Sequence, residues 1–220
     1  MEQAGLDTAP RPEIVTPNDR HTITNVKQPM HSEKNIQETK GEIVLPPAQY
    51  TVMPFKGMHP QLDESVFLAD GARIIGDVKM EKDCSVWFNT VVRGDVNYIR
   101  VGERTNIQDN AVIHVTHKKF PCIIGANVTV GHSAVIHAAT IYDYCLIGMG
   151  AVVLDDAKVG PFALVAAGAV VLGGTVIPEG TLAAGVPAKV VRKLTDEEKA
   201  MLIQSAQNYV DYVAAFRGQS

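Results

Sequence analysis

Aliphatic residues recur at every sixth position through the middle of the chain. They are Leu68, Ile74, Met80, Val86, Val92, Val101, Ile107, Ile113, Ile124, Val130, Ile136, Ile141, Ile147, Val153, Val159, Val165, Val171 and Ile177. The residue four places after most of them is small or β-branched. So short a repeat is typical of a solenoid of short parallel strands, in which each coil covers the apolar face of the previous coil. Three six-residue repeats form one triangular coil, so residues 68–182 predict a parallel β-helix of about six coils.

Three irregular steps interrupt this spacing. The step before Val101 is nine residues long and implies a three-residue insertion at 97–100. The step before Ile124 is eleven residues long and predicts a loop at 117–121, and the step before Ile141 is one residue short. An ordinary alternating strand pattern would not keep its phase over so long a stretch. The sequence therefore predicts one β-helix domain over 54–190.

A different periodicity follows the repeat. Gly and Pro at 185–189 break the strand pattern. Thr195 with Glu198 three positions later forms a capping box, and apolar residues then recur at helical spacing. We expect an amphipathic helix over 196–216, within a C-terminal segment at 191–220. Its apolar face must pack on the solenoid or on a neighbouring subunit.

The first part of the chain, residues 1–53, has no usable periodicity. It is rich in polar residues and proline, and such a composition cannot bury enough apolar surface to offset chain entropy. We expect a disordered or extended tail. It has no apolar segment typical of a secretory signal, and acidic residues such as Glu2 and Asp7 argue against a mitochondrial presequence. An inert extension and a docking arm fit the sequence equally well.

Composition narrows the possible partners and the compartment. A net charge of −4 without a basic cluster argues against nucleic acid or an anionic membrane surface as a partner. The hydrophobic content of 46% is ample for a core, yet no apolar run is long enough to span a membrane. The three cysteines are an odd number without a close pair, which indicates reduced thiols. We therefore expect a cytoplasmic protein.

Three histidines, His114, His132 and His137, occupy positions of the repeat within 24 residues. His114 and His132 are eighteen residues apart, which is one coil, so they are expected at the same edge of the prism in adjacent layers. Three neutral imidazoles with an open fourth position describe a catalytic zinc site. The alternative is that each histidine is an independent solvated residue. His117 lies in the expected loop, where it is either a proton carrier or merely exposed.

These segments resemble the gamma-class carbonic anhydrases, most closely their compact bacterial branch. The likeness covers about residues 54–216, including the C-terminal helix. It is carried by Arg93-Gly94-Asp95, by Asn106-Ile107-Gln108-Asp109 and by the three histidines with their spacing. These motifs are far more specific than the six-residue repeats, which many acyltransferases share.

The resemblance implies a fold, an assembly and a metal. The fold is a left-handed parallel β-helix, which assembles as a homotrimer with one metal at each subunit interface. His114 and His137 would come from one subunit, and His132 from its neighbour. The metal would be Zn²⁺, with Fe²⁺ or Co²⁺ as alternatives, because imidazole serves several transition metals.

The resemblance also assigns roles to residues around the metal. Arg93 and Asp95 match an interface ion pair, and Asp109 matches a position near the arginine of the neighbouring chain. Gln108 matches a residue that hydrogen-bonds the metal-bound water. Tyr209, on the expected helix, is either part of the apolar face, the reading we favour, or a residue that reaches a neighbouring site.

The implied reaction is the reversible hydration of carbon dioxide to bicarbonate. Three neutral imidazoles leave the metal doubly positive, and such a metal lowers the pKa of bound water to about 7. The chain departs from the most active members of the family in its short loop, where His117-Lys118-Lys119 stands in place of a proton-shuttling glutamate. Val96 likewise stands where a second glutamate occurs. A proton must leave in every cycle, so either His117 acts as the shuttle or turnover is weak.

Two other functions remain open. One is a non-catalytic or weakly active trimeric scaffold that retains the metal site, since intact ligands indicate binding and not turnover. The other is a hexapeptide acyltransferase that uses acyl-CoA, for which the segment at 185–189 is also common. Such transferases usually use a single catalytic histidine, and three ligand-spaced histidines are not needed there.

Overall fold

The computed structural model describes residues 38–39, 42–43 and 49–218. The chain divides into two units, 1–46 and 47–220. In the first unit, β1 (Glu38–Thr39) and β2 (Glu42–Ile43) form an antiparallel pair. Residues 1–37, 40–41 and 44–48 of the expected tail lie outside the described residues. The last three residues of that expected tail, Thr51–Met53, instead form the first strand of the solenoid.

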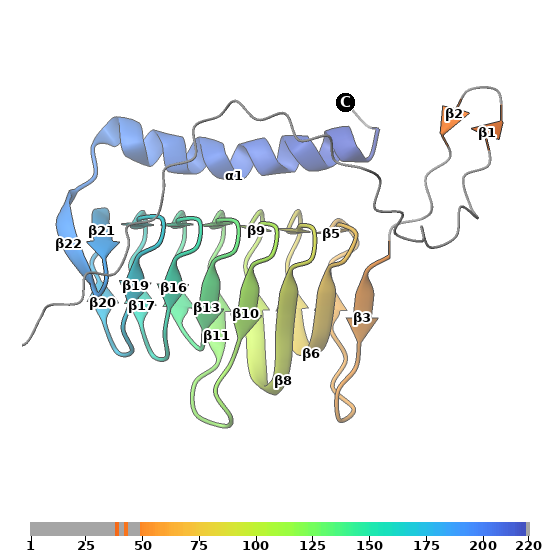
Figure 1. The fold of residues 1–220 in the computed structure, drawn as a ribbon, viewed down its shortest axis with the longest axis horizontal. Coiled ribbons are helices and arrows are strands. Elements are labelled where there is room, and N and C mark those ends of the chain that lie inside the picture. The colour runs from red at the N-terminus through yellow and green to blue at the C-terminus, as the bar shows by residue number, and fades with distance from the viewer. Residues whose placement is uncertain (1–37, 40–41, 44–48, 219–220) are drawn as a thin grey trace, which may run out of the picture. The chain divides into compact units, whose positions relative to one another are not determined.

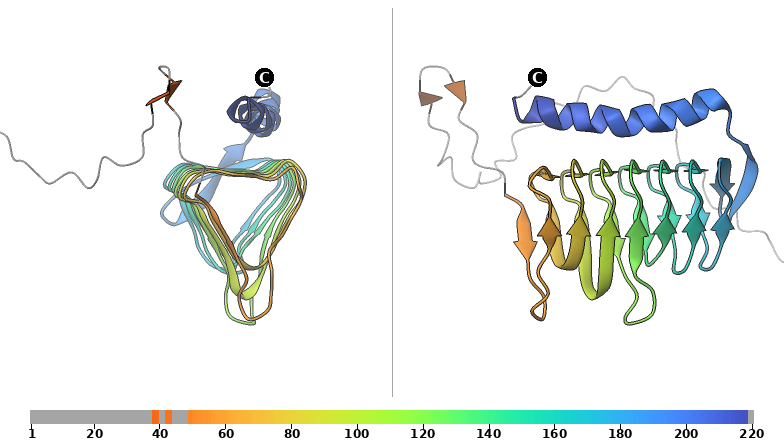
Figure 2. Two further views of the ribbon diagram at one scale, coloured as in Figure 1. Left: turned by 90° about the vertical axis from the view of Figure 1, so that its right-hand side faces the viewer. Right: turned by 180° about the vertical axis from the view of Figure 1, so that it is seen from behind.

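The second unit is a triangular parallel β-helix (Figure 2). Its first face consists of β3 (Thr51–Met53), the first halves of β6 (Arg73–Met80) and β8 (Val91–Val101), β10 (Val112–His114), β13 (Val135–His137), β16 (Val152–Val153) and β19 (Val170–Val171). The second face consists of β4 (Gln61–Leu62), the second halves of β6 and β8, β11 (Cys122–Ile124), β14 (Thr140–Ile141), β17 (Lys158–Val159) and β20 (Val176–Ile177). The third face consists of β5 (Phe67–Leu68), β7 (Ser85–Val86), β9 (Asn106–Ile107), β12 (Thr129–Val130), β15 (Leu146–Ile147), β18 (Leu164–Val165), β21 (Thr181–Gly185) and β22 (Ala188–Lys193).

The predicted left-handed β-helix with one C-terminal helix is confirmed. The third face has eight strands, and only β22 runs antiparallel to its neighbour, which leaves one parallel strand for each of seven coils. The sequence predicted about six coils from residue 68 onward. The additional coil is the first, β3 to β5, most of which precedes the regular repeat.

The aliphatic residues at the first position of each six-residue repeat point into the prism and form its core. Ile74, Ile107 and Ile136 are fully buried, and each contributes about 1.5–3 kcal/mol relative to an exposed side chain. Neighbouring coils approach closely where the chain turns a corner. A Cβ atom at Gly102 would lie 2.7 Å from the backbone nitrogen of Ala126 in the next coil. Glycine at this corner therefore permits the stacking of the coils.

Two corners of the first face matter for the chemistry below. The loop corner joins the first face to the second, and the far corner joins the third face to the first. The expected loop lies at the loop corner between β10 and β11, where it protrudes from the prism (Figure 1). There the Thr116 N–H donates to the Phe120 carbonyl at 3.0 Å. The expected insertion at 97–100 is absorbed within β8, whose pairing with β6 shifts register between Gly76 and Val78.

The helix α1 (Asp196–Phe216) has the bounds that the sequence predicts and runs along the third face (Figure 1). The capping box is present: the Glu198 N–H donates to the Thr195 hydroxyl, and the Glu198 carboxylate accepts from the Thr195 N–H. Ala206 is fully buried, and the Tyr209 ring meets the Trp87 ring edge-on at 5.3 Å. Within the described part of the chain, no helix has the length and apolar character needed to cross a bilayer.

The thiols of Cys84, Cys122 and Cys145 are buried and unpaired. Burial raises the pKa of each thiol to about 12. Cys84 and Cys145 donate weak hydrogen bonds to the carbonyls of Gly102 and Gly160. The thiols are therefore neutral packing groups, in agreement with the reduced state expected from the cysteine count. The cytoplasmic location stays a prediction.

We predict that Gly102→Ala lowers the free energy of unfolding by about 3 kcal/mol, because the new methyl group meets backbone atoms that cannot move aside. Urea unfolding followed by circular dichroism measures the change. Gly174→Ala is the matched control, since that position has a φ of +69° and open space around it. It is expected to cost only about 1 kcal/mol, from backbone strain. Equal losses in the two variants would contradict the argument from coil stacking.

We also predict that the protein loses stability as the pH rises from about 9 toward 12. In this window the unfolded chain releases thiol protons, at a pKa near 9.0, that the folded chain retains up to about 12. Each thiol then lowers the free energy of unfolding by up to about 1.4 kcal/mol per pH unit. Urea unfolding at several pH values should give Cys122→Ala a slope shallower by about that amount. An unchanged slope would show that the Cys122 thiol already titrates in the folded protein.

Candidate metal centre

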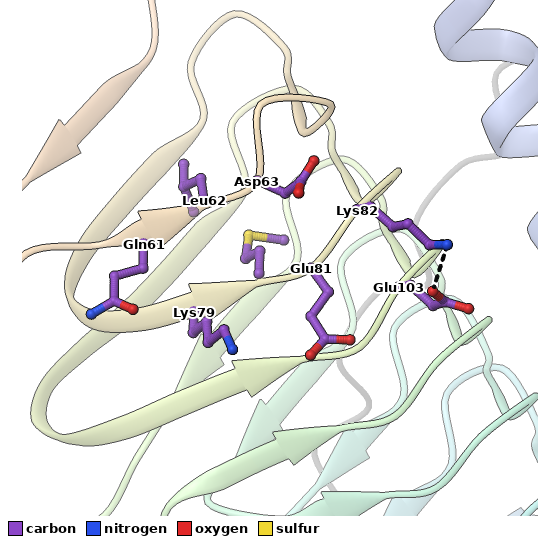
Figure 3. Close-up of a pocket in the computed structure, with 8 residues that line it drawn as sticks. Gln61, Leu62, Asp63, Lys79, Glu81, Lys82 and Glu103 are labelled. Carbon is purple, nitrogen blue, oxygen red and sulfur yellow. Dashed lines mark ion pairs between the residues drawn. The ribbon is translucent and has the colours of Figure 1, made fainter.

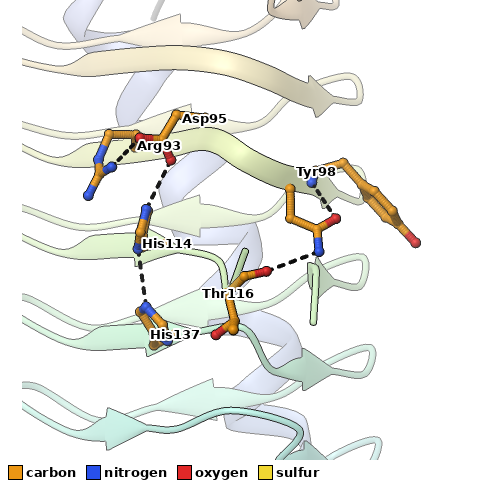
Figure 4. A network of polar contacts seen from close by, with 7 residues as sticks. Arg93, Asp95, Tyr98, His114, Thr116 and His137 are labelled. Atoms are coloured by element: carbon orange, nitrogen blue, oxygen red, sulfur yellow. Dashed lines mark hydrogen bonds and ion pairs between the residues drawn. The ribbon is translucent and has the colours of Figure 1, made fainter. Parts of the chain in front are cut away.

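Two of the three predicted ligands meet at the loop corner. His114 and His137 follow the inward-pointing Ile113 and Ile136, so their side chains point outward from adjacent coils. They are register partners in β10 and β13, and their ring centroids lie 5.1 Å apart. His114 Nδ1 lies 3.1 Å from His137 Nε2 (Figure 4).

A carboxylate holds the outer nitrogen of each ring. Asp95 Oδ1 lies 3.1 Å from His114 Nε2, and Asp155 Oδ1 lies 2.5 Å from His137 Nδ1. An ionised carboxylate only accepts hydrogen bonds, so both outer nitrogens carry their hydrogens. In the neutral imidazoles the two inner nitrogens then both present lone pairs. Two acceptors at 3.1 Å repel unless a cation lies between them.

The cation that fits this pair is a metal ion. A proton on His114 is disfavoured, because burial lowers the pKa of this imidazole and the positive Arg93 lowers it further, which outweighs the raising effect of Asp95. A tetrahedral metal at about 2.0–2.1 Å from two imidazole nitrogens separates them by roughly 3.3–3.4 Å. The observed 3.1 Å is close to that value. The donor set and its spacing therefore suit zinc or a similar transition metal.

Arg93 and Asp95 form an ion pair on β8, beside His114 (Figure 4). Burial alone would raise the pKa of the Asp95 carboxyl, but hydrogen bonds from His114 and Arg93 outweigh it and lower the pKa. Asp95 therefore stays ionised and accepts the hydrogen bond from His114 Nε2. The Arg93 side chain remains 42% exposed, so its guanidinium is available to groups outside this chain.

The third predicted ligand, His132, lies at the far corner, between β12 and β13. The expectation that His114 and His132 share an edge is wrong. The loop between β10 and β11 lengthens that coil, so the residues stacked on one another here are 23 positions apart, as in His114 and His137. His132 is instead stacked with Asp109, and its Nδ1 lies 2.6 Å from Asp109 Oδ2. Its Nε2 is left as the acceptor, and the side chain is 46% exposed.

One described chain therefore holds two parts of a site at opposite ends of the first face. His132 precedes His137 by five residues, and extended backbone covers about 3.3 Å per residue, so the two rings are too far apart to share an ion. In agreement, the described residues contain no group of three His, Cys, Asp or Glu side chains that could hold a metal.

Gln108 lies at the far corner beside Asp109 and is almost fully buried. Its Nε2 donates to Asn106 Oδ1 at 3.1 Å, and Asn106 Nδ2 donates to the Thr129 hydroxyl at 3.0 Å. The Thr129 hydroxyl in turn lies 3.0 Å from the Ser205 hydroxyl on α1. This chain of hydrogen bonds uses one of the two Nε2 hydrogens of Gln108, and its Oε1 can accept a further hydrogen bond.

The two remaining predicted residues do not contact the imidazole pair within the chain. Burial, together with the charge of Asp109, raises the pKa of Tyr209 to about 12, and the ring packs on Trp87. This packing places Tyr209 on the apolar face of the helix, as favoured above. His117 is exposed in the loop, three residues beyond His114. It is the neighbouring Thr116, missed at the sequence level, whose hydroxyl donates to Asp155 Oδ2.

A surface cavity lies away from these residues. It has a volume of about 460 Å³ and lies in the first three coils, and its lining includes an ion pair between Lys82 and Glu103 at 3.2 Å (Figure 3). Its lining consists of Gln61, Leu62, Asp63, Lys79, Met80, Glu81, Lys82 and Glu103. It contains no histidine, so the candidate centre lies on the corners of the prism and not in this cavity.

Known proteins with similar sequences indicate the family of this chain. No protein-family model matches it. The chain is 49% identical to gamma carbonic anhydrase 2, a mitochondrial protein of Arabidopsis thaliana, over 166 residues, which are 73% of this chain and 60% of that protein. It is 44% identical to a carbonic anhydrase of Geobacillus kaustophilus over 160 residues, which are 73% of this chain and 87% of that protein. The chain thus spans under two thirds of the plant protein but most of the bacterial one.

A solved structure agrees with the fold. The putative acetyltransferase of Bacillus cereus has a TM-score of 0.75 and 38% identity, covering 78% of this chain and 99% of that one. The paired imidazoles and their carboxylates are a more specific feature of this chain than the six-residue repeat. With relatives at this level of identity over most of their length, the chain belongs to the gamma carbonic anhydrase family.

Proposed function

We propose that this protein is a homotrimer that binds zinc at each subunit interface and catalyses the reversible hydration of carbon dioxide to bicarbonate. The observation that carries the proposal is the pair of acceptor nitrogens, His114 Nδ1 and His137 Nε2, 3.1 Å apart. Their tautomers are set by Asp95 and Asp155. The names of the relatives, carbonic anhydrases in a plant and in a bacterium, support the same reaction.

The ligands in this proposal are His114 and His137 of one subunit and His132 of the next. A metal held by three neutral imidazoles supplies a water molecule whose pKa is lowered to about 7, and so a nucleophile for carbon dioxide at neutral pH. Fe²⁺ and Co²⁺ accept the same ligands. The carboxylates of Asp95 and Asp155 keep the lone pairs of their imidazoles directed at the ion.

A cyclic trimer brings the two corners together. The loop corner of one prism and the far corner of the next form a heterologous interface, which closes into a ring after three subunits. Residues on both corners are spaced by one coil, about 4.8 Å. When His132 lies opposite His114 and His137, Asp109 in the preceding coil falls opposite the region of Arg93. The negative charge of Asp109 on one corner therefore lies opposite the positive charge of Arg93 on the other.

Gln108 is proposed to orient the metal-bound water, and His117 is proposed to carry away its proton. Gln108 Nε2 donates to Asn106, and we assign to Gln108 Oε1 the role of the acceptor that orients the nucleophilic water. His117 is exposed three residues beyond His114, and imidazole exchanges protons readily near neutral pH. We assign it the role of passing the released proton to solvent.

A second function has a specific observation in its favour. The loop at 115–121 contains no acidic residue, and Val96 is a partly buried side chain packed against the core. A trimer that binds metal but turns over slowly, acting as a scaffold, fits this shortage of proton acceptors near the ion. The acyltransferase alternative does not account for carboxylates on all three imidazoles.

Mixed trimers of two variants test whether the metal site is shared between subunits. His132→Ala and His137→Ala should each abolish metal binding in homotrimers, since each removes one of three ligands. Unfolding and refolding an equal mixture of both variants should restore about a quarter of the sites, because one variant supplies His137 and the other His132. Metal content after gel filtration measures the recovery. No recovery, with trimers intact, would mean that the site is not shared between subunits.

A further prediction concerns turnover. Stopped-flow hydration of carbon dioxide should exceed the buffer background in protein purified without oxygen, and His132→Ala should abolish it. Gln108→Ala should keep its metal but lower kcat/KM by about 10–100-fold, because the water loses its orienting acceptor. Metal bound without hydration would favour the scaffold, and protein that binds no metal would favour the acyltransferase.

A further inference from the structure

Asp155 joins the metal centre to the protruding loop. Its Oδ1 accepts from His137 Nδ1 at 2.5 Å, and its Oδ2 accepts from the Thr116 hydroxyl. Both oxygens of the Asp155 carboxylate are therefore engaged, one by the ring of His137 and one by the loop. The three residues come from three different coils, and Thr116 and Asp155 are 39 positions apart.

The backbone on both sides of this carboxylate is fixed. The turn that follows β16 is bonded to the coil before it, since the Asp156 N–H donates to the Ala138 carbonyl at 2.9 Å. It is also bonded to the coil after it, since the Gly174 N–H donates to the Asp155 carbonyl at 2.9 Å. A carboxylate on so constrained a turn can hold the imidazole ring in one orientation.

Thr116 is equally constrained at the base of the loop. Its N–H donates to the Phe120 carbonyl, and its own carbonyl accepts from Asn97 Nδ2 at 3.2 Å (Figure 4). Only the side chain of Thr116 then remains free to turn, and its hydroxyl is directed at Asp155. The loop therefore contributes a fixed donor to the carboxylate that supports His137.

We infer that Asp155 and Thr116 are positioning residues that fix His137 in the tautomer with hydrogen on Nδ1 and direct its Nε2 toward His114. The role in metal binding rests on the function proposed above, whereas the effect on the ring is a property of the chain alone. Because Thr116 begins the loop at 115–121, the conformation of that loop becomes linked to the quality of one metal ligand. Neither residue contacts the metal in this assignment; both act through His137.

The neighbouring Asp156 provides a matched control. It is exposed, and no hydrogen bond or ion pair of its side chain occurs among the described residues. Its φ of +57° is one that asparagine adopts readily. Asp155→Asn and Asp156→Asn therefore remove the same charge from adjacent positions, and only the first weakens the support of His137. Thr116→Val and Thr116→Ser form a second pair, which removes and keeps the hydroxyl with little change in size.

Metal affinity is the first readout. Cobalt binding followed by its visible absorption, with zinc competition against a chelator, should show about 10–100-fold weaker binding in Asp155→Asn. Thr116→Val should show a smaller loss, and Thr116→Ser and Asp156→Asn should bind as the unaltered protein does. Gel filtration confirms that each variant remains assembled. Unaltered affinity in Asp155→Asn would overturn the inference.

The tautomer of His137 is the second readout and needs no metal. Nitrogen-15 NMR of ring-labelled histidine should show hydrogen on Nδ1 of His137 in the unaltered metal-free protein, with His137→Gln used for assignment. In Asp155→Asn the signal should move toward a mixture of tautomers. Hydrogen on Nε2 in the unaltered protein would overturn the inference. A fixed Nδ1 tautomer in a protein that never binds metal would sink the proposed function and leave the positioning role standing.

Discussion

The candidate centre depends on two lone pairs held face to face. His114 and His137 are stacked in register, and each ring is held from outside by a carboxylate that cannot donate a hydrogen. The inner nitrogens are thus both acceptors, 3.1 Å apart, in a place where burial disfavours an extra proton on His114. This arrangement is unfavourable without a cation and favourable with one. The stacking of the β-helix supplies the register, and the carboxylates supply the tautomers.

The six-residue repeat is sufficient to predict the fold, because every coil must place aliphatic residues inside the prism. The capping box at Thr195 is sufficient to predict where the helix begins. The site was harder to predict. Counting eighteen residues per coil placed His132 with His114, whereas the loop after β10 lengthens that coil and stacks His132 on Asp109. Asp155 and Thr116 were missed, because an outward polar residue in a turn resembles any solvated residue. Their contact depends on the summed lengths of the intervening turns.

In the proposed trimer, the division of the three histidines between two corners couples metal binding to assembly. The imidazole pair and the Asp109–His132 pair lie at opposite ends of the first face, so a single chain offers a metal two ligands at most at each end. An ion that binds all three imidazoles binds only the assembled state, and by mass action it stabilises that state. On the same proposal, the opposite charges of Arg93 and Asp109 favour that contact without metal. Metal binding and subunit contact would then be parts of one equilibrium.

The short loop has consequences for both binding and rate. A longer acidic loop would place a mobile proton acceptor near the water, but this loop ties its first residue to Asp155 and to Asn97. Under the proposed function, the hydroxyl of Thr116 supports the ligand His137, and the exposed His117 is the residue assigned to proton transfer. A rigid ligand set strengthens metal binding without removing protons from the water. On that proposal, the loop geometry that favours a tight site makes departure of the proton the step most sensitive to buffer and to residue 117.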